Sequence, residues 1–128
     1  MRRVILFSLV SAVLLGCGSG NHLLGVWLDT SGKYRETFKD DNKYIAEFPD
    51  GTMQVRIDGA WSYEGQKLHL QPAAIKVTGP DPADAATEQK SIEKRLMQFG
   101  EFTLDWQDND HFSATDSEGG AVKFSRSK

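Results

Sequence analysis

From residue 23 onward, hydrophobic and polar residues alternate in short segments that end at turn residues. The apolar positions with a period of two are Tyr44, Ala46 and Phe48; Val55 and Ile57; Trp61 and Tyr63; Leu68 and Leu70; Phe102, Leu104 and Trp106; and Val122 and Phe124. Their neighbours in the sequence are polar. This alternation is typical of β-strands with one buried face and one face in water.

The segments are separated by residues that close tight turns or tolerate positive φ. These separators are Thr30-Ser31-Gly32, Asp41-Asn42, Pro49-Asp50-Gly51, Asp58-Gly59, Glu64-Gly65 and Ser117-Glu118-Gly119-Gly120. Closely spaced antiparallel hairpins form either a sandwich or an up-and-down barrel. We predict an all-β fold, a small antiparallel up-and-down barrel.

One segment, residues 79–100, breaks this rhythm. Pro80 and Pro82 are followed by good helix formers, and Ile92, Leu96 and Phe99 have helical spacing. The alternative is an acidic, poorly ordered loop or short helix over 80–89, followed by a strand over 91–99. We predict the strand, because one more strand helps to complete a barrel.

The first sixteen residues have the form of a signal peptide. Arg2 and Arg3 precede a run of twelve mainly apolar residues, 4–15. At about 1.5 Å per residue this run spans roughly 18 Å, less than the roughly 30 Å hydrocarbon core of a bilayer. A removable leader is therefore favoured over a permanent transmembrane helix.

The single cysteine, Cys17, directly follows this run in the sequence Leu14-Leu15-Gly16-Cys17. This segment resembles the lipobox of bacterial lipoproteins. The resemblance implies cleavage before Cys17, a diacylglycerol on its thiol and acylation of the new amino terminus. The alternative is an ordinary exported protein with an accidental cysteine. We predict a signal peptide over 1–16, a lipidated tether over 17–22 and one barrel domain over 23–128.

Lipidation of Cys17 makes the lipid bilayer a partner of the protein, since two or three acyl chains give lasting attachment. The predicted location is the bacterial cell envelope. Gly18 follows the cysteine, whereas in the enterobacterial lipoproteins an aspartate there favours retention in the inner membrane. The resemblance thus implies the periplasmic face of the outer membrane if the source is Gram-negative.

Three further stretches carry a second resemblance. Leu24-Gly25-Val26-Trp27, TFKDDNKY and GAWSYEGQKLHL resemble the small lipocalin-like domains of bacterial lipoproteins. In that family a Gly-x-Trp on the first strand pairs with an arginine at the end of the last strand, which implies that Trp27 and Arg126 close the barrel. The domain is shorter than a typical lipocalin.

Charge and motif content exclude several functions. The net charge is −3 and becomes more negative once Arg2 and Arg3 leave with the leader, so a nucleic-acid partner is not expected. The three histidines lack metal-ligand spacing, and residues 105–110 lack the spacing of a calcium loop, so no metal or cofactor is expected. No nucleophile elbow or phosphate loop occurs either. We predict no catalytic residues and no enzymatic activity.

Glu36 is the most informative polar residue, because it shares a strand face with Tyr34 and Phe38. If that face points inward, the carboxylate must be paired, solvated or protonated.

Two functions follow from a lipid-anchored barrel. We predict first a non-enzymatic interaction or structural module of the envelope, with a solid core and an envelope protein as its partner. The alternative is a barrel mouth that binds a small apolar or amphipathic molecule. The candidate lining of that mouth is Glu36, Phe38, Tyr44, Trp61 and Tyr63.

Overall fold

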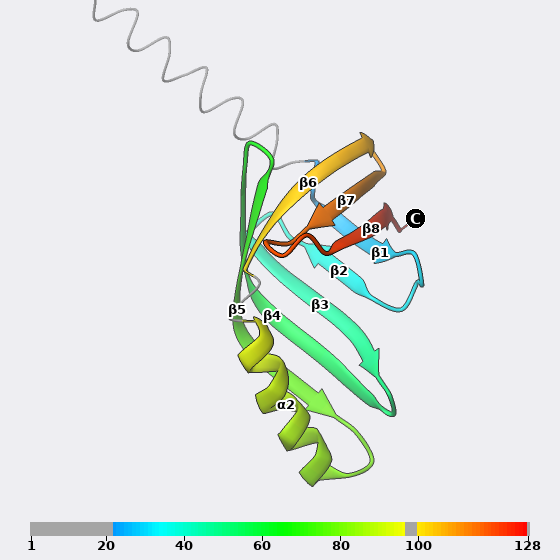
Figure 1. Ribbon diagram of the computed structural model, residues 1–128, viewed down its shortest axis with the longest axis vertical. Coiled ribbons are helices and arrows are strands. Elements are labelled where there is room, and N and C mark those ends of the chain that lie inside the picture. Colours follow the sequence, from blue (N-terminus) through cyan, green and yellow to red (C-terminus); the bar gives the residue numbers. More distant parts are fainter. Residues whose placement is uncertain (1–21, 97–99, 128) are drawn as a thin grey trace, which may run out of the picture.

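The strands close into a single antiparallel barrel (Figure 1). The computed structural model describes residues 22–96 and 100–127. The elements are β1 (Gly25–Asp29), β2 (Arg35–Phe38), β3 (Lys43–Asp50), β4 (Met53–Glu64), β5 (Lys67–Thr78), α2 (Pro82–Leu96), β6 (Glu101–Asp108), β7 (His111–Thr115) and β8 (Ala121–Arg126). Each strand pairs with the next and β8 pairs with β1, so the predicted all-β up-and-down barrel is confirmed. The predicted leader and Cys17 lie outside the described residues.

Most of the predicted turns lie where the sequence placed them. Gly51 and Gly65 close the β3–β4 and β4–β5 hairpins with φ values of 62° and 63°. The turn predicted at Asp58-Gly59 is wrong, because β4 runs through these residues with a shift in register. Gly59 is needed for close approach rather than for a turn, since a Cβ there would lie 2.7 Å from the ring of Tyr44.

The strand predicted over 91–99 is also wrong for its described part, because residues 82–96 form the helix α2. Asp81 caps this helix, and its Oδ1 accepts hydrogen bonds from the backbone N–H groups of Ala83 and Asp84 at 2.9 and 3.4 Å. Pro82 occupies the first turn, where its missing N–H costs nothing. Residues 97–99 lie outside the described part of the chain.

The helix replaces a strand partner along β5 (Figure 1). Only residues 67–69 of β5 pair with β6, which leaves the rest of that strand edge without a neighbouring strand. Ala85 and Ile92 are buried, and Gln89 Oε1 accepts a hydrogen bond from the backbone N–H of Val77 at 3.4 Å. A covered edge cannot pair with another chain, so α2 protects the part of the sheet that extends past the barrel.

The barrel has two distinct ends. The closed end lies where β1 begins and β8 ends, and it contains the buried Leu23 and Trp27. The mouth lies at the opposite end, between the β1–β2 and β7–β8 turns. The buried interior between them is rich in aromatic rings, and Phe112 stacks on Phe124 with ring centroids 5.2 Å apart.

Candidate functional site

The closed end is held by Arg126, which lies opposite Trp27 in the register of β1 and β8. The guanidinium carbon of Arg126 is 4.4 Å from the centroid of the Trp27 ring. The same guanidinium donates hydrogen bonds to the carbonyl oxygens of Leu24 at 2.7 Å and His22 at 2.8 Å, and to Oδ1 of Asp110 at 3.0 Å. The structure thus brings together the closure pair named from the sequence.

Gly25 makes this contact sterically feasible. Its φ of 121° disfavours any side chain, and a Cβ at this position would lie 3.0 Å from Nη1 of Arg126. The indole of Trp27 is fully buried, and its N–H donates to the carbonyl oxygen of Leu23 at 2.9 Å. Glycine at position 25 leaves room for the Arg126 guanidinium, and tryptophan two residues later supplies the ring on which it lies. This accounts for the Gly-x-Trp spacing.

The mouth contains a cavity of about 230 Å³. Its lining residues come from six strands and two turns: Asp29, Tyr34, Glu36, Phe38, Leu68, Leu70, Phe102, Phe112, Ala114, Asp116, Gly120, Val122 and Phe124. Val122 at the rim is 45% exposed, so the cavity is open to solvent. Most of its wall is apolar, with polar groups at only a few points.

Glu36 is the only acidic or basic residue that is buried within the described part of the chain, with 5% of its surface exposed. In the sheet it lies between Trp27 on β1 and Ala46 on β3. Among the described residues, no hydrogen bond or ion pair reaches its carboxyl group. Burial raises the pKa of Glu36 to about 8, because the apolar surroundings disfavour the charged form. At neutral pH this group is therefore mainly a neutral carboxylic acid.

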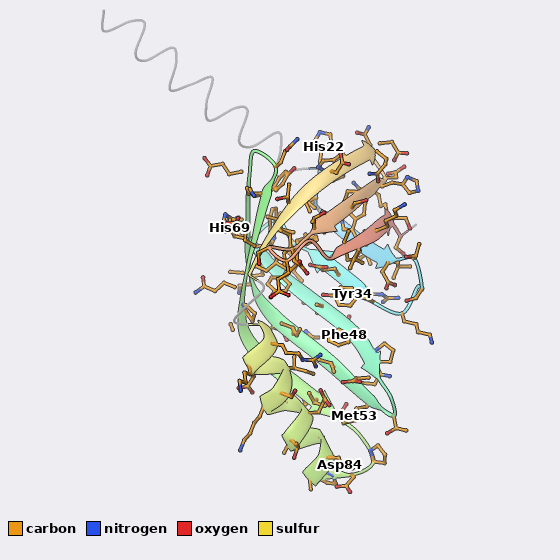
Figure 2. The ribbon with its side chains drawn as sticks, in the orientation of Figure 1. His22, Tyr34, Phe48, Met53, His69 and Asp84 are labelled. Atoms are coloured by element: carbon orange, nitrogen blue, oxygen red, sulfur yellow. The ribbon has the colours of Figure 1, made fainter. Side chains whose placement is uncertain are left out.

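Two tyrosines lie near Glu36. Burial, and then the nearby Glu36, raise the pKa of Tyr34 well above its usual value, and the same two causes raise the pKa of Tyr44. Both phenols therefore stay neutral throughout the physiological range. Tyr34 also stacks on Phe48, with ring centroids 5.2 Å apart, and Figure 2 shows this pair leading from the mouth toward the β3–β4 hairpin.

Two carboxylates lie at the rim of the cavity. Burial raises the pKa of Asp29, but hydrogen bonds from the Ser31 hydroxyl and from backbone N–H groups outweigh it, so this pKa lies below its usual value. Asp116 Oδ1 accepts hydrogen bonds from the backbone N–H groups of Glu118 and Gly120, both at 2.9 Å. Both carboxylates are thus held in place by their own turns.

Of the five lining residues named from the sequence, Glu36 and Phe38 line the cavity and three do not. Tyr44 packs over Gly59. The indole N–H of Trp61 donates to the carbonyl oxygen of Lys39 at 3.1 Å, which fixes the β2–β3 turn.

Tyr63 lies toward the closed end instead, where its hydroxyl accepts a hydrogen bond from the Trp106 indole at 3.0 Å. The sequence reasoning missed Phe112 and Ala114, although their spacing of two residues on β7 marks one strand face. It also missed Asp29, the last residue of β1, and Asp116 in the β7–β8 turn. The alternation of apolar residues does not point to either, because both are polar and lie at the end of a strand or in a turn.

Within 22–96 and 100–127, no three histidine, cysteine, aspartate or glutamate side chains are grouped so as to hold a metal ion. No helix in this part of the chain is long and apolar enough to cross a membrane.

The fold and the cavity define a small closed β-barrel domain with a pocket at one end. Its sequence matches no protein-family model and no curated protein. Among solved structures the chain is similar to a DUF4847 family protein from Bacteroides vulgatus, with a TM-score of 0.46 and 15% sequence identity. The similarity covers 75% of this chain and 60% of that one. At this level the likeness carries no argument about function.

Proposed function

We propose that this protein is a lipid-anchored envelope lipoprotein whose barrel mouth binds a compact, largely apolar molecule. The observation that supports this most directly is the open cavity of about 230 Å³ with Glu36 in its wall, whose carboxyl group has no hydrogen-bond partner among the described residues. An apolar cavity with a few polar groups is the usual form of a small-molecule site. Binding of a small molecule is the second of the two functions predicted from the sequence; the first, an interaction or structural module with a solid core, has no comparable support.

The size of the cavity limits the ligand. Sites for drug-sized molecules enclose about 300–1,000 Å³, so about 230 Å³ suits a smaller ligand. Eight-stranded barrels have room for side chains or for one small ligand. One small residue, Ala114 on β7, contributes to the wall of the cavity. A purely structural barrel would gain stability from a larger apolar residue at position 114, since each additional buried methylene contributes about 0.8 kcal/mol.

The position of the chain entry suits a membrane-anchored binding protein. Arg126 binds the carbonyl oxygens of His22 and Leu24 at the closed end, and Figure 2 shows His22 far from Tyr34 at the mouth. Residues 18–22 span at most about 17 Å when extended. With Cys17 in the bilayer, the closed end would face the membrane and the mouth would open toward the aqueous side.

Ligand binding can be tested with neutral probes on the mature chain from residue 17, carrying Cys17→Ser so that no lipid is attached. We expect titration with toluene or benzyl alcohol to shift the amide NMR signals of Phe112, Ala114 and Phe124, with saturation. Ala114→Leu, which fills part of the cavity, should weaken the binding at least tenfold. Absence of saturable shifts at these residues would contradict the proposal.

A further inference from the structure

We infer that the mouth cavity selects a compact amphipathic amine, with its ammonium group paired to the Glu36 carboxylate and its apolar body against Phe38 and Phe112. This inference rests on the proposed binding function and names the chemical class of the ligand. It follows from the charges in the wall, the burial of Glu36 and the fact that none of the residues in 22–96 and 100–127 pairs with its carboxyl group.

The charge of the cavity wall has one sign. Glu36 lies inside, and Asp29 and Asp116 lie at the rim. None of the described residues that line the cavity is lysine, arginine or histidine. An anionic ligand would bring its charge toward three carboxyl groups without a compensating cation, whereas a cationic ligand meets complementary charge both at the rim and inside.

Glu36 supplies the second, independent observation. Its side chain is 5% exposed and lines the cavity, and no described side chain or backbone group donates a hydrogen bond to it. The carboxyl oxygens reach the open space of the cavity, because no side-chain nitrogen or oxygen among the described residues is both fully buried and without a hydrogen-bond partner. A purely apolar ligand would cut the carboxyl group off from solvent without giving it a hydrogen bond, which is costly. A hydroxyl would give one neutral hydrogen bond, and an ammonium group would give a charge-assisted bond about twice as strong.

Binding of the amine should release one proton to solvent. Below pH 8 the free cavity holds Glu36 mainly as –COOH. An entering R–NH₃⁺ converts it to –COO⁻ paired with R–NH₃⁺, while H⁺ leaves to solvent.

The other titratable groups near Glu36 are Tyr34, Tyr44 and Asp29. None of them changes charge between pH 6 and 8, because the pKa values of the tyrosines are raised and that of Asp29 is lowered. Asp116 faces the same space from the β7–β8 turn and accepts two backbone hydrogen bonds. Affinity for an amine should therefore rise with pH up to about 8.

Three probes of one shape test this inference: benzylamine, benzyl alcohol and benzoate, titrated into the mature Cys17→Ser chain at pH 6, 7 and 8. We expect benzylamine to bind at least tenfold more tightly than benzyl alcohol at pH 8, and benzoate to bind most weakly. Affinity for benzylamine should rise by up to about tenfold per pH unit, whereas affinity for benzyl alcohol should stay constant. Calorimetry in two buffers of different ionisation enthalpy should detect about one released proton.

Glu36→Gln should remove the preference for benzylamine and its pH dependence while benzyl alcohol still binds. The matched control is Glu47→Gln, which removes an exposed carboxylate on the neighbouring strand β3 and should change neither. If Glu36→Gln does not fold, calorimetric measurement of proton release with the protein that retains Glu36 still tests the amine inference.

The outcomes separate the two proposals. Equal, pH-independent binding of benzylamine and benzyl alcohol would overturn the amine inference and leave the binding function intact. Preference for benzoate would also overturn it. If no probe shifts the signals of the cavity residues, both the inference and the proposed function fail.

Discussion

The guanidinium of Arg126 lies 4.4 Å from the ring centroid of Trp27, across the pairing of β8 with β1 that closes the barrel. These residues come from opposite ends of the described chain, so they meet only because the first and last strands are neighbours. Closure leaves neither of these strands with a free edge. The same arginine holds the chain where it enters the domain, through the carbonyl oxygens of His22 and Leu24.

Substitutions at this pair should be coupled. Arg126→Ala should lower the free energy of unfolding by about 1–3 kcal/mol, because carbonyl acceptors lose their donor, and Trp27→Ala by about 3–5 kcal/mol. A double-mutant cycle measured by urea unfolding should give a coupling of at least about 0.5 kcal/mol, with little change in denaturant slope. The control is the exposed Arg56, which forms an ion pair with the exposed Asp58, and Arg56→Ala should cost less than about 0.5 kcal/mol. If the changes in the free energy of unfolding from the two substitutions simply add, the predicted coupling between Trp27 and Arg126 is wrong.

Glu36 should make the protein less stable as pH rises. Its pKa is about 8 in the folded state and near 4.5 when the chain is unfolded, so the folded state binds more protons between these values. The free energy of unfolding should therefore fall between pH 5 and 8, with Glu36 contributing up to about 1.4 kcal/mol per pH unit. Glu36→Gln should gain stability over the unsubstituted protein as pH rises, which urea unfolding at several pH values measures. Parallel pH profiles for the two proteins would show that Glu36 does not titrate in this way, and Glu47→Gln serves as the control.

Filling the cavity should stabilise the domain. Ala114 lines the cavity, so Ala114→Leu adds apolar atoms where there is room and should raise the free energy of unfolding by about 1 kcal/mol. Ala46 is equally small and 1% exposed but does not line the cavity, so Ala46→Leu should overpack the core and cost about 1–3 kcal/mol. Thermal unfolding of both variants tests the difference. Destabilisation by both to the same extent would mean that the cavity does not accept a side chain.

Anchoring depends on Cys17, which lies outside the described residues. We expect Cys17→Ser to move the protein from the membrane fraction to the soluble fraction when bacteria that express each form are fractionated. The reason is that acyl chains supply the membrane affinity, at about 0.8 kcal/mol per buried methylene. Mass spectrometry of the mature protein should show a lipid on Cys17, and an unmodified thiol there would contradict the prediction.

The helix α2 should be stabilised by its contact with β5. Ile92 is 3% exposed, and Ile92→Ala should cost about 2–4 kcal/mol and speed hydrogen exchange along α2. Lys90 is exposed on the same helix, so Lys90→Ala is a matched control with an expected change of less than about 0.5 kcal/mol. Rapid exchange throughout residues 86–96 in the unsubstituted protein would contradict a stable helix.

The sequence of residues 82–96 has features of a helix, but the assumption that the barrel needs one more strand leads to the wrong prediction there. Ile92 has helical spacing from its apolar neighbours, and Asp81 precedes Pro82 as a helix cap. The strand was favoured because a barrel was expected to need it. In the structure β6 pairs with only the first residues of β5, and this short pairing is sufficient to close the barrel. The length of that overlap is set by strand register, which the local sequence does not encode.

The sequence by itself determined the class of fold and the residues that face inward, because the pleat of a strand sends alternate side chains to opposite faces. The resemblance to lipocalin-like domains added the expectation that Trp27 and Arg126 would meet. Only the tertiary structure decided how far each inward-facing residue lies along the barrel axis, between the closed end and the mouth. Register and strand stagger place Glu36 and Phe38 at the cavity, and they place Tyr63 near the closed end. Only the tertiary structure decided which groups face the Glu36 carboxyl, because strand register and barrel closure bring residues of β5 to β8 to the same cavity.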